Sequence, residues 1–277
     1  MKFTKMHGCG NDYVYVNLFE ETIEDPAALS VKISDRHFGV GSDGLITIGP
    51  SDQADFRMRI YNADGSEAEM CGNGIRCVAK YVYDHHLTDR QEIRVETGAG
   101  IKTLQLIVEN GKVAKVRVDM GQPILEPELI PVLAEGPQVV DEPITAAGRE
   151  WNMTCVSVGN PHAVIFVDDV EHFDLEKYGP VFENHERFPK RINTEFVHVI
   201  SRTEAAMRVW ERGSAETLAC GTGTCASVMA CILNGFTANE VLVHLRGGDL
   251  EIAYDPGSRH IFMTGPATEV FQGEWQQ

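Results

Sequence analysis

Apolar and polar residues alternate in many short segments of the chain, a pattern typical of β-strands that are buried on one face. The strands expected in the first half are residues 13–16, 45–48, 56–61, 101–108 and 114–120. Those expected in the second half are residues 156–167, 196–200, 206–210, 241–245, 250–254 and 260–263. Asn110-Gly111 predicts a hairpin in the first half, and Pro256-Gly257 predicts the matching turn in the second.

Three segments have the pattern of helices instead. Residues 74–83 and 223–233 are apolar on nearly every side, which predicts helices buried inside their domains. Residues 26–35 are amphipathic and predict a helix on the outside. Each half is therefore expected to be an antiparallel sheet or barrel wrapped around a central helix, which is an α+β fold.

The same cysteine motif occurs twice in the chain. Met70-Cys71-Gly72-Asn73-Gly74 is matched by Ala219-Cys220-Gly221-Thr222-Gly223, 149 residues later. Other segments with this offset are Gly10-Asn11 and Gly159-Asn160, residues 58–61 and 207–210, and Glu67 and Glu216. A register kept from residue 10 to about residue 100 indicates a duplicated domain. If the halves face each other, the two thiols would lie on opposite sides of one cleft.

Length, charge and cysteine content narrow the class of protein. With 277 residues the chain can form two domains, and the proline-rich region 123–148 places their boundary near residue 120. The net charge of -17 argues against nucleic acid or an anionic membrane as a partner. No apolar run of about 18 residues and no signal peptide is found, so a cytoplasmic protein is expected. Seven cysteines without a Cys-x-x-Cys pair argue against a disulfide framework and a metal site.

The position of each motif cysteine suggests its chemistry. The start of a helix carries unpaired N–H groups and a partial positive charge, and glycines let a carboxylate approach that backbone. The same environment favours the thiolate form of cysteine. Cys71 could remove an α-proton while Cys220 returns a proton from the far side, or the reverse. This arrangement predicts a two-base racemase or epimerase that needs no cofactor.

Polar residues also recur at matched positions. The matched pairs are Asn11 and Asn160, Asn62 and Glu211, and Gly44 and Asn193, with His162 close behind Asn160. The second copies differ in side chain, as expected where a symmetric scaffold binds an asymmetric ligand.

These motifs resemble those of the diaminopimelate epimerase family over nearly the full length. The segments that carry the resemblance are residues 3–12, 62–66, 70–77, 159–162, 210–213 and 219–224. The resemblance implies interconversion of LL- and meso-diaminopimelate without a cofactor, for lysine and peptidoglycan precursors, by a homodimer. It also implies two pseudosymmetric domains with the active site in the cleft between them. The last strand would return to the first domain, so the expected domains are residues 1–120 with 264–277, and residues 121–263.

The resemblance further implies a role for each site residue. Cys71 and Cys220 would be the acid/base pair, with His162 assisting Cys71 and Glu211 assisting Cys220. The residues expected at the reacting end of the substrate are Gly72, Asn73, Gly221, Thr222, Asn11 and Asn160. Those expected at the distal amino acid centre are Asn62, Asn193 and Arg212, and Glu211 is also expected to contact the substrate. Gly44 is left out of this set, because some members carry Gln there and glycine has no side chain to contribute.

Four other readings remain open. A proline or hydroxyproline racemase would not need Asn62, Asn193 and Arg212, because proline has no distal charged centre. An isomerase of the phenazine-biosynthesis type would lack the thiol pair. A cysteine hydrolase built from Cys71, His162 and an Asn would leave Cys220 unexplained. A non-enzymatic amino-acid-binding or redox protein would turn over no substrate.

Overall fold

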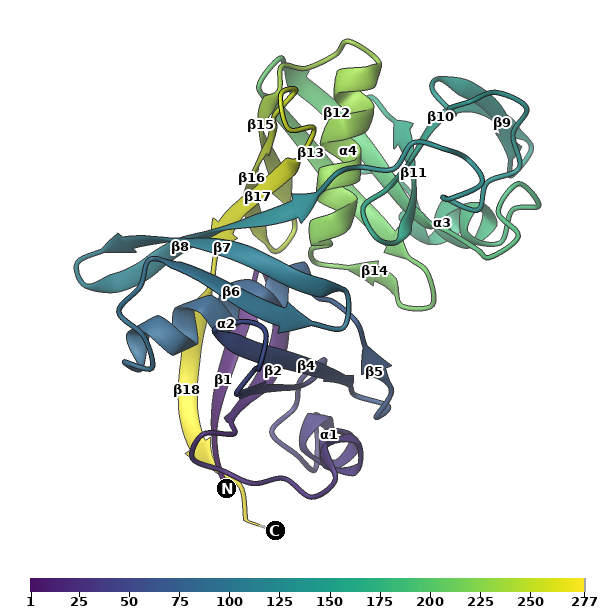
Figure 1. Ribbon diagram of the computed structural model, residues 1–277. Coiled ribbons are helices and arrows are strands. Elements are labelled where there is room, and N and C mark those ends of the chain that lie inside the picture. Colours follow the sequence, from purple (N-terminus) through teal and green to yellow (C-terminus); the bar gives the residue numbers. More distant parts are fainter. Residues whose placement is uncertain (277) are drawn as a thin grey trace. The chain divides into compact units, whose positions relative to one another are not determined.

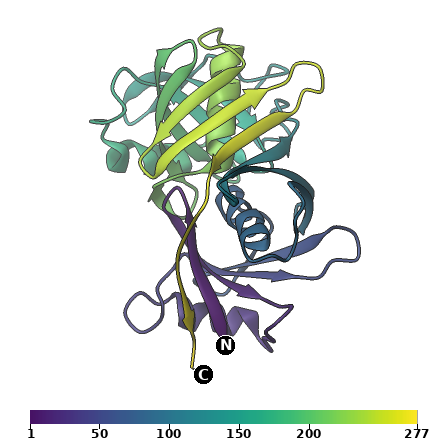
Figure 2. The ribbon, with the colours of Figure 1, turned by 90° about the vertical axis from the view of Figure 1, so that its left-hand side faces the viewer.

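The chain divides into two compact units in the computed structural model, which describes residues 1–276 (Figures 1 and 2). Unit 1 comprises Met1–Asp119 and Thr264–Gln277, and unit 2 comprises Met120–Met263. No helix in residues 1–276 is long and apolar enough to span a bilayer.

Unit 1 is a mixed sheet around helix α2 (Gly72–Asp84), with helix α1 (Pro26–Ser34) packed on β3 and β4. Its strands are β1 (Lys2–Gly8), β2 (Asn11–Asn17), β3 (Gly44–Gly49), β4 (Phe56–Asn62), β5 (Glu67–Ala68), β6 (Glu92–Thr97), β7 (Gly100–Glu109), β8 (Lys112–Gly121) and β18 (Thr268–Glu274). They pair in the order β18–β1–β2–β3–β4–β6–β7–β8, with β5 added to β4. The last strand therefore lies beside the first, as the yellow and purple ribbons show in both views.

Unit 2 repeats this plan around helix α4 (Gly221–Leu233), with helix α3 (Leu175–Glu183) packed on β12 and β13. Its strands are β9 (Glu142–Ala146), β10 (Arg149–Ser157), β11 (Pro161–Phe166), β12 (Asn193–Ser201), β13 (Glu204–Glu211), β14 (Ala215–Thr217), β15 (Glu240–Leu245), β16 (Gly248–Tyr254) and β17 (Ile261–Pro266). Strands β9 to β16 pair in the order β9–β10–β11–β12–β13–β15–β16, with β14 added to β13.

The central helices α2 and α4 are buried along most of their length, which confirms the prediction from their apolar sequences. Helix α4 contains no charged residue. Helix α2 carries Arg76 with no exposed surface, and its guanidinium donates to the carbonyls of Pro266 at 3.0 Å and Gly72 at 3.2 Å. These bonds satisfy the buried charge and tie the helix to the returning C-terminal segment.

The duplication extends to the pairing of strands. Tyr13 lies opposite Gly44 where β2 meets β3, and His162 lies opposite Asn193 where β11 meets β12. Other matched partners are Leu45–Tyr61 with Thr194–Trp210, and Ile60–Ala68 with Val209–Thr217. All of these pairs keep the offset of 149 residues. The two units are therefore copies in backbone hydrogen bonding as well as in sequence.

The sheets are mixed, whereas the sequence pattern suggested antiparallel strands throughout. The parallel pairs are β2–β3, β4–β6, β11–β12 and β13–β15. Each of these pairs is joined by a connection that carries one of the four helices, as a parallel pairing requires. The α+β class is unchanged, but the helices serve as crossovers.

Three details of the second half differ from the pattern analysis. Residues 156–167, expected as one strand, form the end of β10 and all of β11, because Gly159 turns the chain with a φ of 95°. Helix α3 was missed because it contains Pro180 and Gly179, both unfavourable inside a helix. Strand β9 lies in the proline-rich connection and was also missed. The hairpin at Asn110-Gly111 is confirmed, with φ values of 51° and 77°.

A bidentate ion pair holds the strand that leads to each motif cysteine. In unit 1, Arg59 Nε and Nη2 donate to Glu67 at 2.8 Å each. In unit 2, Arg208 donates to Glu216 at 2.7 and 2.9 Å. The first pair is about half exposed, whereas the Arg208 and Glu216 side chains are 10% and 18% exposed. The same ion-pair geometry therefore occurs at the surface in unit 1 and largely buried in unit 2.

We expect Glu216→Gln to lower the free energy of unfolding by about 3 kcal/mol, because it leaves a buried guanidinium without its carboxylate. Glu67→Gln is the matched control and should lower it by no more than about 1 kcal/mol. Urea unfolding followed by tryptophan fluorescence measures both values. Equal losses for the two variants would contradict this difference in burial.

Candidate active site

Cys71 and Cys220 occupy the same structural position, the residue that caps the N-terminus of a central helix. Both have extended backbone angles, as capping residues do. The Cys71 sulfur accepts the amide N–H of Gly74 at 3.2 Å, and the Cys220 sulfur accepts that of Gly223 at 3.4 Å. Each sulfur thus takes the place of the oxygen of a capping Ser or Asp, and each stands in the positive field of a helix N-terminus.

The glycine three residues after each cysteine is required by packing. A Cβ at Gly74 would lie 2.6 Å from Cδ1 of Ile46, and a Cβ at Gly223 would lie 2.4 Å from Oε1 of Glu195. Ile46 on β3 and Glu195 on β12 are themselves 149 residues apart. The last glycine of each motif therefore allows the helix to begin directly against the sheet.

Asn11 connects Cys71 to a charged network. The Asn11 amide nitrogen donates to Asp43 Oδ2 at 2.7 Å. Because a carboxylate can only accept, the amide oxygen of Asn11 must face the other way, where it accepts from the Cys71 thiol at 3.2 Å. Cys71 therefore has an N–H donor on one side and an oxygen acceptor on the other, the two partners that a thiol needs to gain or lose a proton.

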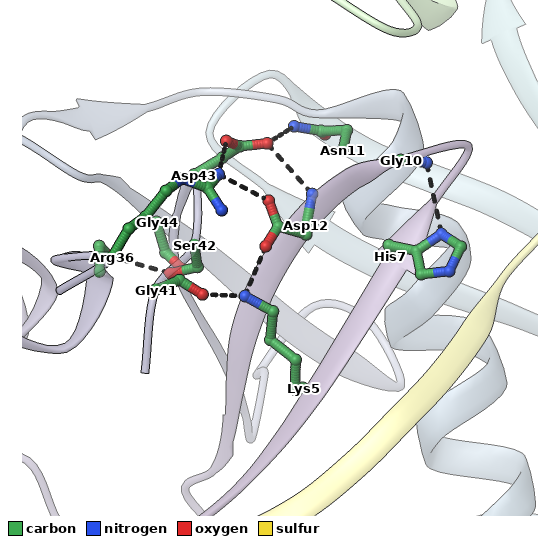
Figure 3. Close-up of polar contacts among 11 residues, drawn as sticks. Lys5, His7, Gly10, Asn11, Asp12, Arg36, Gly41, Ser42, Asp43 and Gly44 are labelled. Atoms are coloured by element: carbon green, nitrogen blue, oxygen red, sulfur yellow. Dashed lines mark hydrogen bonds and ion pairs between the residues drawn. The ribbon is translucent and has the colours of Figure 1, made fainter. Parts of the chain in front are cut away.

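The network behind Asn11 is ionic. Arg36 Nη2 donates to Asp43 at 2.9 Å and to Asp12 at 3.0 Å, and Lys5 pairs with Asp12 at 2.5 Å and also donates to the carbonyl of Gly41 (Figure 3). Partial burial raises the pKa of Asp12, but the hydrogen bonds from Lys5 and Arg36 outweigh it, so the pKa is lowered overall. Asp12 thus stays ionised, and the bond to Asp43 fixes the orientation of the Asn11 amide.

Cys220 stands among acidic groups. It is 6% exposed, and its sulfur lies 3.5 Å from the hydroxyl of Thr222. Burial raises the pKa of Cys220 well above its usual value, and the negative charges of Glu211 and Glu195 raise it further. These groups favour the thiol form of Cys220.

Glu211 has the environment of an acid/base residue. Its Oε1 accepts from the hydroxyl of Thr217 at 2.5 Å. Burial raises the pKa of Glu211, and hydrogen bonds with Thr217 and Cys220 offset only part of this effect. A carboxyl group with a raised pKa beside a thiol can exchange a proton with it.

His162 is fully buried on β11 with both ring nitrogens engaged. Its Nδ1 lies 2.7 Å from Glu195 Oε1, and its Nε2 lies 2.9 Å from Asn160 Oδ1. Asn160 therefore supports His162 here, whereas its counterpart Asn11 supports Cys71.

Asn193 and Arg212 are linked at the start of β12. The Asn193 side chain is 4% exposed and uses both ends of its amide, donating to the carbonyl of Pro161 at 2.7 Å and accepting the N–H of Arg212 at 2.9 Å. The Arg212 guanidinium is exposed and donates to the carbonyl of Lys190 at 3.1 Å. Asn193 thus fixes the position of the Arg212 backbone.

The remaining expected site residues lie near Cys71 and Cys220 or near Gly44. Gly72, Asn73, Gly221 and Thr222 form the first turns of α2 and α4, where no carbonyl of the helix reaches their N–H groups. Asn62 ends β4 and donates to the hydroxyl of Ser66 at 3.0 Å. A Cβ at Gly44 would lie 2.2 Å from the carbonyl oxygen of Tyr61, so close strand packing requires the glycine.

Three residues near these thiols were missed in the sequence analysis. Tyr13 is buried, and burial and the Cys71 charge raise its pKa far above the usual value, so it remains a neutral phenol. Asp43 orients Asn11, and Glu195 pairs with His162. The offset of 149 residues pairs Tyr13 with His162 and Ile46 with Glu195, and a full comparison of the two halves could have found them.

Comparison with known proteins identifies the family. A profile described as diaminopimelate epimerase matches residues 3–126 and 154–270. The chain belongs to the diaminopimelate epimerase family. A protein of this name from Agathobacter rectalis is 75% identical over 281 residues, with 99% of each chain covered. Diaminopimelate epimerases from Acetivibrio thermocellus and Methanococcus maripaludis strain C5 are each 59% identical over 274 residues, covering 99% of this chain and 98% and 99% of theirs.

Solved structures of more distant proteins share the fold of this chain. A phenazine biosynthesis protein of the PhzF family from Bacillus anthracis aligns with a TM-score of 0.70 at 17% identity, covering 100% of this chain and 99% of the other. A hydroxyproline epimerase from Agrobacterium vitis, with bound trans-4-OH-L-proline, aligns with a TM-score of 0.67 at 15% identity, covering 99% and 90%. At these identities the likeness concerns the fold alone.

We expect Glu211→Gln to lower the pKa of the Cys220 thiol, because a nearby negative charge is removed. The pH dependence of Cys220 alkylation by iodoacetamide, read by peptide mass spectrometry, should move to lower pH. Glu142→Gln is the control, since Glu142 pairs with Arg187 at 2.7 Å and is not among the charges that act on Cys220. An unchanged or higher midpoint in Glu211→Gln would contradict the electrostatic effect of Glu211.

Proposed function

We propose that this chain interconverts LL- and meso-diaminopimelate by moving a proton at one α-carbon between two thiols. Membership of the diaminopimelate epimerase family supports the substrate. The observation that carries the mechanism is that Cys71 and Cys220 both cap the central helix of their unit and both accept a first-turn N–H.

The reaction requires stabilisation of a carbanion. An α-proton is weakly acidic, so the substrate carboxylate must take up negative charge as the proton leaves. We assign this role to the first-turn amides of α2 and α4, at Gly72, Asn73, Gly221 and Thr222. The helix N-termini supply N–H donors and positive potential without a metal or an imine.

The proton moves are balanced between the two thiols. One sulfur, as thiolate, takes the α-proton, and the other, as thiol, gives a proton to the opposite face of the same carbon, which inverts it. In our proposal Glu211 exchanges a proton with Cys220, and His162 does so with Cys71, which resets the pair for the next turnover. The raised pKa values of Glu211 and Cys220 suit such an exchange.

The substrate contacts are assigned as follows. Asn11 and Asn160 would line the reacting centre, since their amide oxygens face Cys71 and His162. Asn62, Asn193 and Arg212 would bind the distal centre, where the Arg212 guanidinium matches a carboxylate. Asn193 would act chiefly through the backbone of Arg212, which it holds.

The proposal predicts deuterium incorporation. Reduced protein with LL-diaminopimelate in D2O should yield the meso isomer with deuterium at the inverted α-carbon, followed by proton NMR. Cys71→Ala and Cys220→Ala should each lower the rate by about 10³-fold or more, since each removes one acid/base group. Cys231→Ala, in the buried part of α4, is the control and should keep the wild-type rate.

Two results would contradict it. Wild-type protein that leaves the α-proton signal intact would remove the substrate assignment. Either alanine variant retaining more than a tenth of the wild-type rate would remove the two-thiol mechanism. The rival substrates proline and hydroxyproline, run in parallel, distinguish a wrong substrate from inactive protein.

We further propose that the enzyme is a cytoplasmic homodimer. Strand β18 carries Val270 and Phe271 with 54% and 46% of their surfaces exposed, which is apolar area that a partner chain could cover. Light scattering after size exclusion should give about twice the chain mass of 30.6 kDa. Val270→Lys should shift the mass toward that of one chain, and a wild-type mass of one chain would overturn the proposal.

A further inference from the structure

The duplication supplies an internal comparison for every buried position. Tyr13 of unit 1 corresponds to His162 of unit 2, and Ile46 corresponds to Glu195. The strand partners are also the same, with Ile46 opposite Ile60 and Glu195 opposite Val209. In one copy the site therefore holds a phenol and an aliphatic side chain, and in the other an imidazole and a carboxylate.

The carboxylate of Glu195 is buried without full compensation. Glu195 and His162 both have side chains with no exposed surface, and Glu195 Oε1 lies 2.7 Å from His162 Nδ1. Glu195 Oε2 has no hydrogen-bond partner in residues 1–276. Burying an ion pair whose remaining lone pairs are unsatisfied disfavours folding relative to apolar residues of similar size.

The fold does not require this carboxylate. Ile46 takes the same place against Gly74 that Glu195 takes against Gly223, and the two helices begin in the same way. A packing role is thus met in unit 1 by an aliphatic side chain. The acidic group in unit 2 needs another explanation, and its carboxylate lies within hydrogen-bond distance of His162.

The surroundings of His162 define what the carboxylate can do. Glu195 faces it from β12, Asn160 accepts at its Nε2, and Glu211 from β13 and Cys220 from the start of α4 are the nearby titratable groups. A carboxylate on one side and an amide oxygen on the other can each accept an N–H of the ring. The Glu195 carboxylate is the partner of Nδ1 in a site where neither side chain has exposed surface.

We propose that Glu195 is a positioning residue that keeps His162 protonated at Nδ1 and leaves Nε2 as the nitrogen that exchanges a proton with the active-site thiol. This inference rests on the proposed function. In the step, the proton on Nε2 passes to a thiolate sulfur, which leaves a thiol and a neutral imidazole that keeps its Nδ1 proton. The reverse step restores the imidazolium, and Glu195 remains a carboxylate throughout. The tautomer is thereby the same in every turnover.

The direct test observes His162 in the intact protein without substrate. Nitrogen-15 NMR of histidine-labelled protein, with His162→Gln to assign the signal, should show a proton on Nδ1 of His162 in the wild type. Glu195→Gln removes the charge, and Glu195→Ile installs the residue that unit 1 tolerates at this place. In both variants Nδ1 should move to the position of an unprotonated nitrogen. An unchanged His162 spectrum in both variants would overturn the proposal.

Kinetics provide the second readout. We expect Glu195→Gln to lower kcat by about 10- to 100-fold, the usual effect of removing a group that orients a histidine, with KM changed by less than about threefold. The pH–rate profile should also move to lower pH, because Glu195→Gln removes a negative charge that favours protonation of the ring. Glu142→Gln removes a carboxylate of unit 2 that faces Arg187, and it should leave kcat and the profile unchanged.

The outcomes separate the two proposals. If the wild type exchanges no α-proton of diaminopimelate, the proposed function fails, whatever the NMR signal of His162. If the wild type is active but Glu195→Gln and Glu195→Ile keep its kcat, pH profile and His162 signal, only the role of Glu195 fails. A lower folding stability with unchanged pH profile would assign Glu195 a structural role and likewise overturn the proposal.

Discussion

The hydrogen bond from a first-turn amide to a cysteine sulfur is the interaction on which both halves of the molecule depend. It satisfies an N–H that an isolated helix leaves open, so it stabilises α2 and α4 as any capping bond would. The same bond favours negative charge on the sulfur. Folding and reactivity therefore use one contact, and the glycine that donates the N–H must remain without a side chain to keep the helix against the sheet.

The two copies of this arrangement differ in what surrounds the sulfur. Beside Cys71 lie the amide oxygen of Asn11 and the phenol of Tyr13, and Asn11 in turn binds the Asp43 carboxylate. Beside Cys220 lie the ionisable side chains of Glu211 and Glu195, and Glu195 pairs with His162. The two copies of one scaffold thus place different side chains beside equivalent cysteines.

The repeated cysteine motif predicted more of the molecule than the alternation of apolar and polar residues did. The buried helices, the Asn110-Gly111 hairpin and the α+β class follow from local pattern, because apolar runs and turn residues act over short distances. Helix α3 was not predictable in this way, since Pro180 and Gly179 contradict helix propensity, and Gly179 is explained only by Trp210, which would lie 2.4 Å from a Cβ there. Buried polar residues such as Glu195 look like exposed charges in a strand pattern, and only the comparison with Ile46 reveals that the position faces the core. The parallel strand pairs could not be predicted, because a local sequence pattern does not tell which strands are neighbours in the sheet.

The return of the C-terminus to the first unit has a consequence for how the chain is made. β1 pairs with β18, and Met1 and Trp275 exchange backbone hydrogen bonds at 3.0 and 2.7 Å. Unit 2, in contrast, is one continuous stretch of chain. The sheet of the first unit therefore cannot close until residues 268–274 have been made, after all of unit 2. The half of the chain that is synthesised first is thus the half that is finished last.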